Sequence, residues 1–545
     1  MNSSPLEKFY LWERTTPDSL FLRQPIDGRW REYSYRDAGR EIRSLSAALQ
    51  AMNLPNGSNI AILSKNCAHW IMADLAIWMA GHVSIPIYPT LSAGAIRFVL
   101  EHSEAKIIFL GKLDDYANQR SGIPELIKKI SFPLYGPNDG ELWDELLKTP
   151  PVTNDFKPKP GTLATVIYSS GTTGTPKGVM LEFGALDFFS QAAVKNFGVN
   201  NGCPFFSYLP LAHIAERAYI EMVVLYSGGN ISFAESLEKF PKNLSEVKPV
   251  LFGGVPRIYA KFQEGVLSKL SQKRLDFLLS LPVVRGLVKK FIQKKIGLIN
   301  ATTIVCGAAP IPISLLKWYK SIGINIHEIY GMTEDCGMSH GDHGKAFKYG
   351  TVGRPWKEVE SKVSEEGEIL IRHQALMKGY YKDPETTKAV FTSDGFLRTG
   401  DKGSYDNERF LTITGRLKDQ FKTDKGKFVA PAAIELKLLS NHDIEQVCVV
   451  GSGVPQPIAL VTLSVAGKIK SREEISNSLK STLDKFNPSL ESFERLTKAV
   501  VMKSDWTIEN GLVTPTLKVK RNEIEKLHLP MYPVWYCHDE IVIWE

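Results

Sequence analysis

The sequence predicts an α/β protein in which largely parallel strands alternate with helices, and two observations support this fold class. Short apolar runs that suit buried strands occupy Asn59–Leu63, Val83–Tyr88 and Ala105–Leu110, and segments with helical spacing separate them. The chain has 545 residues, 43% hydrophobic and 23% charged, which is ordinary for a globular protein. That length suffices for a large domain with a smaller one, or for two to four lobes.

The predicted elements follow one another in a regular order. Helices are expected over Tyr33–Leu54, Trp70–Gly81 and Ala93–Ser103, where apolar residues recur at helical spacing. The most apolar long segment, Trp70–Tyr88, contains Asp74, His82 and Pro86, so we expect a buried helix leading into a strand rather than a membrane span. The stretch Gly136–Pro160 is rich in Pro, Gly, Asp and Lys and is predicted to be a surface connection.

Composition narrows the classes of ligand and compartment. The net charge of +7 suits anionic ligands such as ATP or coenzyme A, but it is too small to indicate nucleic acid, and no basic run is interleaved with aromatics. Six widely spaced cysteines form no CxxC pair, which favours a reduced, cytoplasmic setting over a disulfide framework. The N-terminus lacks the pattern of a signal peptide, and no integral membrane span is expected.

A phosphate-binding loop is predicted directly after the apolar run Leu163–Tyr168. Glycines allow backbone N–H groups to close around an anion, hydroxyls can contact phosphate or a metal ion, and a lysine adds charge. The spacing differs from a Walker A loop, because Lys177 comes three positions after Gly174, with Pro176 between them, instead of directly after the glycine. The alternative is a flexible linker. The residues concerned are Ser169, Ser170, Gly171, Thr172, Thr173, Gly174 and Lys177.

Two later segments have the chemistry of a nucleotide site. The strand Thr303–Cys306 ends in the small residues Gly307, Ala308, Ala309 and Pro310, which permit close approach of a planar ring. Tyr330 can then stack on a base, Thr333 can bond a phosphate oxygen, and Glu334 offers the oxygen ligand that Mg²⁺ prefers. The alternative for the second segment is a strand-to-helix turn with a capping glutamate.

Together these segments resemble the AMP-forming adenylating enzymes, the superfamily of acyl- and aryl-CoA synthetases, luciferases and peptide-synthetase adenylation domains. The resemblance spans Tyr33 to Arg521, with five motifs in the family's order and spacing. It implies a large N-terminal domain of layered α/β subdomains, residues 1–416, and a small mobile α+β C-terminal domain, residues 417–545. It also implies ATP, Mg²⁺ and coenzyme A as reactants or cofactors.

The resemblance assigns roles residue by residue. ATP binding falls to Ser169–Gly174, Lys177, Gly307–Pro310, Glu328, Ile329, Tyr330, Gly331, Met332, Thr333, Asp401 at the ribose, and Arg416; metal binding falls to Glu334 and Ser169. Lys518 corresponds to the lysine between the attacking carboxylate and the α-phosphate, and Lys520 is its competitor. His213 is placed beside the acyl pocket, Lys418 at the hinge, and Lys422, Gly426 and Lys427 along the coenzyme A channel. Lys425 and Arg409 depart from glycines that are frequent in relatives.

Substrate preference is also suggested by resemblance. Tyr208–Arg217 and Gly253–Lys261 are similar to the acyl-pocket and acyl-tunnel segments of fatty acyl-CoA synthetases, so a medium- to long-chain fatty acid is the expected substrate. The expected product is the coenzyme A thioester, formed through an acyl-adenylate. Rival hypotheses are an acyl-AMP ligase serving a carrier protein, and a catalytically dead binding homologue. A luciferase-like oxygenase has no support beyond the shared fold.

One basic and apolar segment suggests a membrane contact. Residues 262–298 combine lysines with runs such as Leu275–Leu279, and such a segment can lie peripherally on a lipid surface. The competing hypothesis is a pair of packed amphipathic helices with solvated lysines. For the aromatic tail, Leu527–Glu545, packing against the C-terminal lobe is expected.

Overall fold

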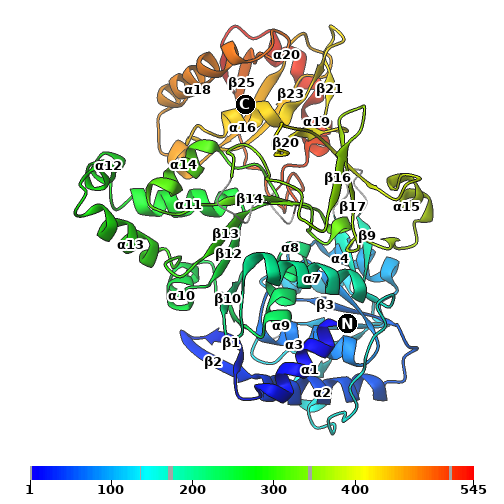
Figure 1. Cartoon of the computed structure of the whole chain (residues 1–545). Coiled ribbons are helices and arrows are strands. Elements are labelled where there is room, and N and C mark those ends of the chain that lie inside the picture. The colour runs from blue at the N-terminus through cyan, green and yellow to red at the C-terminus, as the bar shows by residue number, and fades with distance from the viewer. Residues whose placement is uncertain (1–2, 136, 170–175, 342–346, 515–517) are drawn as a thin grey trace.

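A computed structural model shows the predicted α/β architecture, with strands arranged in five sheets among the described residues. The structure describes residues 3–135, 137–169, 176–341, 347–514 and 518–545. In Figure 1 the N-terminal elements form the lower body, and the yellow-to-red C-terminal elements lie above them.

The first large sheet carries the predicted phosphate loop at its antiparallel side. Its central strands pair in parallel, with Asn59 opposite Val83 and Ile60 opposite Ile107, which confirms the predicted strand–helix alternation. In spatial order the strands are β18 (Gly379–Tyr380), β9 (Lys177–Glu182), β8 (Leu163–Ser169), β4 (Val83–Ile87), β3 (Asn59–Leu63), β5 (Ile107–Leu110), β6 (Lys128–Ser131) and β7 (Glu141–Leu142).

The second large sheet positions the predicted adenine wall. Strands β13 and β14 are parallel, with Cys306 opposite Glu328, so the segments that follow them lie at the same sheet edge. In spatial order the strands are β15 (His340–Gly341), β14 (His327–Tyr330), β13 (Thr303–Cys306), β12 (Leu251–Gly254), β10 (Pro204–Ser207), β11 (Asn230–Phe233), β1 (Leu20–Ile26) and β2 (Arg29–Ser34).

Helix α3 (Ala68–Met79) lies between the two large sheets and is buried along all twelve residues. It contacts β3 and β4 of one sheet and β1 of the other, which explains why its sequence is apolar on every face. The prediction of a buried helix leading into β4 is confirmed. No helix within the described residues is long and apolar enough to cross a membrane.

The other N-terminal helices begin and end where local sequence signals place them. Capping boxes start the first two, formed by Ser4 with Glu7 and by Ser34 with Asp37. The helices are α1 (Pro5–Thr15), α2 (Tyr35–Ala51), α4 (Ala93–Ser103), α5 (Tyr116–Gln119), α7 (Phe183–Phe197), α8 (Ile214–Glu216), the π-helix η2 (Arg217–Met222), α9 (Val223–Ser227), α10 (Phe240–Val247), α11 (Pro256–Leu267), α12 (Gln272–Ser280), α13 (Arg285–Lys295), α14 (Ile313–Ser321) and α15 (Pro384–Val390).

The connection between residues 136 and 160 is more ordered than predicted. It contains β7 and the short helix α6 (Trp143–Leu146), and Trp143 is buried with its ring centroid 5.1 Å from that of His69. The indole Nε1 of Trp143 donates to Glu41 at 3.0 Å. A single large aromatic residue therefore anchors a segment whose composition otherwise indicates a loop.

A smaller antiparallel sheet lies between the N-terminal body and the last part of the chain. It contains β16 (Glu360–Val363), β17 (Glu368–Arg372), β19 (Leu397–Tyr405) and β20 (Leu411–Arg416). Its register places Asp401 opposite Arg416, although 15 residues separate them in sequence.

The C-terminal part folds around a four-stranded sheet. Its elements are the hairpin β21 (Phe421–Lys422) and β22 (Phe428–Val429), the sheet β23 (Ile444–Val450), β24 (Ile458–Leu463), β25 (Lys498–Val501) and β26 (Val542–Trp544), and helices α16 (Pro431–Leu438), α17 (Val465–Lys468), α18 (Arg472–Phe486), α19 (Arg521–His528) and α20 (Tyr532–Tyr536). The tail supplies β26, and Tyr532 and Trp535 are buried beside Ile543. Its predicted packing against this lobe is confirmed.

Candidate active site

The two ends of the predicted phosphate loop lie directly opposite each other. Ser169 ends β8, Lys177 begins β9, and these residues pair across the antiparallel ladder. The predicted loop residues Ser170, Gly171, Thr172, Thr173 and Gly174 lie outside the described residues. The Lys177 ammonium lies 5.0 Å from the ring centroid of Tyr380, which comes from β18 beside it.

Glu334 lies next to this lysine–tyrosine pair. Its carboxylate accepts a hydrogen bond of 2.9 Å from the Tyr380 hydroxyl, and its backbone carbonyl accepts one of 2.8 Å from the Met377 amide. Burial raises the pKa of Glu334, while the Tyr380 hydroxyl and the Arg416 charge oppose that rise. Sequence reasoning missed Tyr380, because nothing local links β18 to the turn that carries Glu334.

The donor set around Glu334 fits a magnesium ion that arrives with a nucleotide. No group of three or more His, Cys, Asp or Glu side chains within the described residues is arranged to hold a metal by itself. Mg²⁺ is usually held by one or two carboxylates together with substrate phosphates and water. A single buried carboxylate next to Tyr380 and Lys177 matches that pattern.

Asp401 is the centre of a polar cluster that three elements build. One carboxylate oxygen accepts from Arg416 Nε at 3.0 Å, and the other accepts from the Tyr330 hydroxyl at 2.7 Å. Strands β19 and β20 bring Asp401 and Arg416 together, and β14 ends at Tyr330. The sequence predicts Tyr330 as a stacking ring; its hydroxyl contact with Asp401 is an addition that only the structure reveals.

The segment predicted to pack against adenine follows β13 and is largely exposed to solvent. Ala308, Ala309 and Pro310 are exposed, whereas Gly307 is partly buried against Ile329. Ala308 has a φ of +66°, a left-handed conformation uncommon for alanine. Glu328, Ile329, Met332 and Thr333 continue the wall from β14, and burial raises the pKa of Glu328 to about 7.

Gly331 is required by close backbone packing in the same turn. A Cβ atom at this position would lie 2.5 Å from the carbonyl carbon of Gly337. The Asp335 carboxylate, buried in the following 3₁₀ turn η3 (Thr333–Asp335), accepts from the amides of Met332 at 2.8 Å and Met338 at 3.1 Å. Sequence reasoning missed Asp335, whose two backbone contacts hold the turn that presents Glu334.

Lys518 reaches this cluster from the far end of the chain. Burial, together with the nearby positive charge of Arg416, lowers its pKa to about 8, while Asp401 and Glu334 favour its charged form. The side chain retains solvent-accessible surface, so water still reaches it. Its backbone is held by a pair of hydrogen bonds with Thr514, at 2.8 and 3.1 Å.

The competing lysine, Lys520, has a different position. Lys520 is the residue that precedes helix α19, and its amide donates to the Leu512 carbonyl at 2.8 Å. The electrostatic interactions with Asp401, Glu334 and Arg416 belong to Lys518. These electrostatic interactions favour Lys518 over Lys520 as the lysine of this cluster.

His213 lies close enough to Lys518 to respond to its charge. Burial and the Lys518 ammonium lower the pKa of His213 to about 4, so the imidazole is neutral at physiological pH. Its Nδ1 accepts from the Ala215 amide at 3.1 Å, which leaves Nε2 as the N–H tautomer. The ring centroid lies 6.5 Å from that of Tyr88.

A buried glutamate holds the segment that carries His213. Glu216 accepts from the Ser207 hydroxyl at 2.7 Å and from the Tyr208 amide at 2.8 Å, and burial raises its pKa to about 8. These bonds tie α8 to the end of strand β10. Sequence reasoning missed this role, although a carboxylate in an apolar run is itself a signal of a buried polar anchor.

The predicted hinge and coenzyme A residues are not brought to this cluster. Lys418 lies exposed in the turn after β20. Lys422, Gly426 and Lys427 belong to the hairpin β21–β22, whose label lies at the upper edge of Figure 1, away from β9 and β14. The Lys427 ammonium lies 6.0 Å from the Phe493 ring centroid, so the hairpin packs on the C-terminal part.

Two departures from the family pattern fall at turns. Arg409 has a φ of +64°, a left-handed backbone conformation that favours glycine. Its guanidinium donates to the Ser361 carbonyl at 3.3 Å. Beside the other departure, Lys425, Gly426 has a φ of +76° and provides the glycine that the turn needs.

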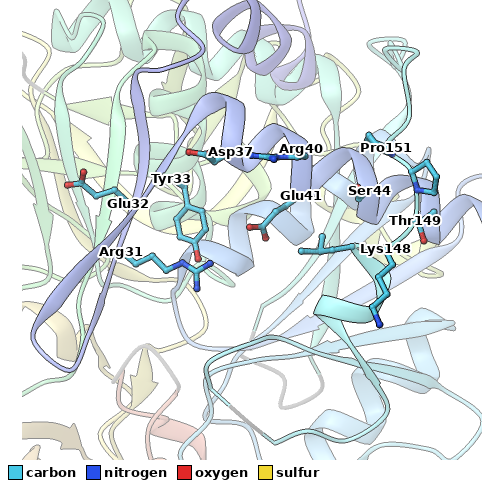
Figure 2. Close-up of a pocket in the computed structure, with 12 residues that line it drawn as sticks. Arg31, Glu32, Tyr33, Asp37, Arg40, Glu41, Ser44, Lys148, Thr149 and Pro151 are labelled. Atoms are coloured by element: carbon cyan, nitrogen blue, oxygen red, sulfur yellow. Dashed lines mark hydrogen bonds and ion pairs between the residues drawn. The ribbon is translucent and has the colours of Figure 1, made fainter.

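A separate pocket of 530 Å³ lies beside β2, α2 and the connection after α6. Figure 2 shows its side chains, among them Arg31, Asp37, Arg40 and Glu41. Its lining contains none of the residues predicted for ATP, acyl or coenzyme A binding. Its three basic and three acidic side chains balance in charge, and Arg40 pairs with Asp37 at 3.4 Å, so it offers little attraction to an anionic ligand.

Known proteins resemble this chain over nearly its whole length. The model of the AMP-binding enzyme family matches residues 9–381, and the model of the AMP-binding enzyme C-terminal domain matches residues 418–528. The long-chain-fatty-acid–CoA ligase FadD15 of Mycobacterium bovis is 29% identical, covering 94% of this chain and 93% of its own. Long-chain-fatty-acid–CoA ligase 5 of Mus musculus is also 29% identical, covering 86% of this chain and 78% of its own.

Solved structures share the fold. The anthranilate CoA ligase AuaEII, solved with anthranoyl-AMP, has a TM-score of 0.80 at 19% identity, covering 98% of both chains. ATP-bound MatB from Rhodopseudomonas palustris has a TM-score of 0.78 at 21% identity, covering 98% of this chain and all of its own. The family match extends across two thirds of the residues and includes both the phosphate loop and Glu334. The chain therefore belongs to the AMP-binding enzyme family and is an adenylate-forming ligase.

Proposed function

We propose that this protein is an ATP-dependent fatty acid–CoA ligase that prefers medium- to long-chain acids. The observation that carries the proposal is the convergence of Lys177, Glu334, the Asp401–Arg416 pair and Lys518 from distant parts of the chain. Opposite charges gathered in this way suit a triphosphate held at one end and a ribose at the other. The long-chain ligases among the relatives support the substrate class.

In the first step the acid's carboxylate attacks the α-phosphate in line, pyrophosphate leaves, and an acyl-adenylate forms. Such a transfer needs positioning and charge stabilisation more than covalent help from the protein. Asp401 orients the ribose, Lys177 faces the leaving phosphates, and the Lys518 ammonium stabilises the charge between carboxylate and α-phosphate. Glu334 and the Ser169 hydroxyl would hold Mg²⁺, which would supply further positive charge at the phosphates.

His213 supports the proposed acyl substrate because it is neutral. A neutral imidazole beside Lys518 tolerates an apolar chain better than an imidazolium would, and it leaves the lysine as the cation that meets the carboxylate. The Glu216 anchor keeps this histidine at the end of β10.

In the second step coenzyme A attacks the acyl carbonyl and AMP leaves. We propose that the chain divides between residues 416 and 417, and that the C-terminal domain turns about Lys418. The turn withdraws Lys518 and brings Lys422, Gly426 and Lys427 toward the adenylate. The separation between this hairpin and the Asp401 cluster supports two arrangements for two half-reactions.

The test compares Lys518→Ala with Lys520→Ala by measuring acyl-adenylate formation and ATP binding. Lys518→Ala is expected to lower adenylation by about 10²- to 10³-fold, as the loss of one charge-stabilising group does, while ATP binding changes little. Lys520→Ala removes the same charge two residues away and is expected to adenylate at nearly the wild-type rate. Equal rates for Lys518→Ala and the wild type would refute the assignment.

The acceptor and the acid are tested by pyrophosphate release with acids from acetate to very long chains, with and without coenzyme A. Multiple turnover that requires coenzyme A is the expected result. Turnover that instead requires a carrier protein's phosphopantetheine arm would identify an acyl-AMP ligase. No release with any acid would identify a catalytically dead homologue.

A further inference from the structure

The helical hairpin formed by α12 and α13 carries most of the protein's excess positive charge. Residues 272–295, here called the basic hairpin, contain seven Lys or Arg residues and one acidic residue, a net charge of +6 against +7 for the whole chain. Figure 1 shows the hairpin at the left edge of the molecule, beyond α11 and α14. The basic residues are Lys273, Arg274, Arg285, Lys289, Lys290, Lys294 and Lys295.

One face of the basic hairpin is fully engaged by the protein. Leu275 and Ile292 are buried in the cluster that also contains Trp318 and Tyr319 of α14. Gln272 accepts from the Trp318 indole at 3.1 Å, and Gln293 donates to the Ile322 carbonyl at 2.9 Å. The hairpin is therefore a docked element with a defined inner face.

The opposite face exposes large apolar side chains. The side chains of Phe277, Val283, Leu287 and Phe291 are 64%, 87%, 70% and 62% exposed, and they come from both helices and the turn between them. Leu287 and Phe291 are four residues apart and therefore lie on one side of α13. Packing of two amphipathic helices explains why Leu275 and Ile292 are buried. It does not explain why phenylalanines are exposed on the outer face.

The basic side chains around these apolar residues have no acidic partners in the part of the chain that the structure describes. None of the seven forms an ion pair with another described residue. The Lys295 ammonium lies 5.6 Å from the Phe291 ring centroid, so charge and apolar surface occupy the same side of α13. Unpaired cations interspersed with outward-facing aromatic and aliphatic side chains are typical of elements that lie in a membrane interface.

We propose that the basic hairpin binds the surface of an anionic lipid bilayer. Phe277, Val283, Leu287 and Phe291 enter the interfacial region, and the surrounding lysines and arginines contact the negative headgroups. A bilayer accounts for this surface better than an acidic protein does. Charge complementarity with an acidic protein would explain the lysines and arginines but not the exposed phenylalanines. The proposal concerns binding alone and stands apart from the chemistry proposed above.

The test is cosedimentation of the full-length protein with vesicles of phosphatidylcholine alone or mixed with phosphatidylserine. The wild type is expected to bind the anionic vesicles at least about tenfold more tightly than the neutral ones, and to lose that advantage in high salt. Binding to neither type of vesicle would overturn the proposal and would favour an acidic protein as the partner.

Two triple variants separate the contributions of charge and apolar surface. Lys290→Gln/Lys294→Gln/Lys295→Gln is expected to weaken binding to anionic vesicles by roughly 100-fold, at about fivefold for each cation. Phe277→Ser/Leu287→Ser/Phe291→Ser is expected to weaken it by about tenfold or more.

Matched controls carry the same changes elsewhere on the surface. Lys480→Gln/Lys485→Gln/Lys503→Gln removes the same charge from the C-terminal part, and Leu126→Ser/Leu237→Ser/Ile469→Ser removes three side chains that are at least as exposed. Both controls are expected to bind like the wild type. Equal losses in controls and hairpin variants would refute the proposal. Circular dichroism and turnover of a short, water-soluble acid check that the hairpin variants fold.

Discussion

Two aspartate–arginine pairs in this protein have the same chemistry and opposite surroundings. Asp74 and Arg217 are completely buried, with an Nη2 to Oδ2 distance of 2.5 Å. Asp401 and Arg416 are paired at 3.0 Å, but the Arg416 side chain is 44% exposed. The first pair joins α3 to the π-helix η2, and the second joins two strands next to Lys518.

The partners of each pair explain the difference. Arg217 also donates to Thr165 at 2.9 Å and lies 5.1 Å from the Trp78 ring centroid, so its contacts are all internal. Burial and the Asp74 charge raise the pKa of the adjacent Glu221, and the Arg217 guanidinium lies 3.5 Å from its carboxylate. Asp401 is itself largely buried, but its partner Arg416 is 44% exposed and Lys518 lies nearby. The fully buried pair, here called closed, stabilises the packing of two elements. The partly exposed pair, here called open, can still bind a ligand.

The largest effect is expected when the closed pair is broken. Arg217→Met leaves Asp74 buried without its cation, and the free energy of unfolding should fall by about 3–5 kcal/mol. Urea unfolding followed by fluorescence measures this change. Arg217→Met/Asp74→Leu removes both charges and should recover at least half of the loss. If Arg217→Met is as stable as the wild type, the buried pair does not stabilise the fold, and the proposed contrast between the two pairs is wrong.

A smaller effect, on binding rather than stability, is expected at the open pair. Asp401→Asn should weaken ATP binding by roughly 10- to 150-fold, because the proposed charged acceptor of the ribose hydroxyls is lost, while stability changes by less than about 1 kcal/mol. Isothermal titration calorimetry and urea unfolding measure the two quantities. Tyr330→Phe removes one hydrogen-bond donor to Asp401 and should have a smaller effect, weakening ATP binding by about threefold to tenfold. A loss of stability comparable to that of Arg217→Met would show that the open pair is structural too.

The smallest expected effect is a pH dependence of adenylation, set by Lys518 beside the open pair. Lys518 has a pKa of about 8, so its ammonium is charged below that pH and becomes neutral above it. Because adenylation is proposed to need the charge, pyrophosphate release should be maximal below pH 8 and fall to about half near that value. His213, with a pKa of about 4, does not titrate in this range.

Lys518→Arg is the control for this pH profile. A guanidinium stays charged throughout the range, so the decline above pH 8 should vanish whatever the variant's absolute rate. A decline that persists in Lys518→Arg would assign it to another group.

Individual helices and strands were predictable because the sequence patterns that specify them lie within the elements themselves. Asn59–Leu63, Ala93–Ser103 and Thr303–Cys306 have the predicted bounds, since hydrophobic periodicity and flanking residues act within a few positions. The phosphate loop, Glu334, Asp401, Arg416 and Lys518 could be selected by motif resemblance. The burial of Trp143 could not be predicted, because it depends on His69 of α3 and Glu41 of α2, which are distant in sequence.

The contacts inside the site were beyond sequence reasoning for the same reason. The bond between Tyr330 and Asp401 spans 71 residues, and that between Glu334 and Tyr380 spans 46. Each depends on how elements from separate parts of the fold lie against one another: β14 against β19 for the first bond, and the turn η3 against β18 for the second. Spacing along the chain carries no information about which hydroxyl reaches which carboxylate.

By itself the sequence determined the fold class, the family and the identity of the charged residues that gather at the site, because these reside in periodicity and motif. Only the tertiary structure decided which of two aspartate–arginine pairs is sealed and which is partly exposed, which hydroxyls reach Asp401 and Glu334, and that phenylalanines face outward on α12 and α13. Exposure and electrostatic environment depend on everything packed around a side chain, and that packing exists only after distant segments meet.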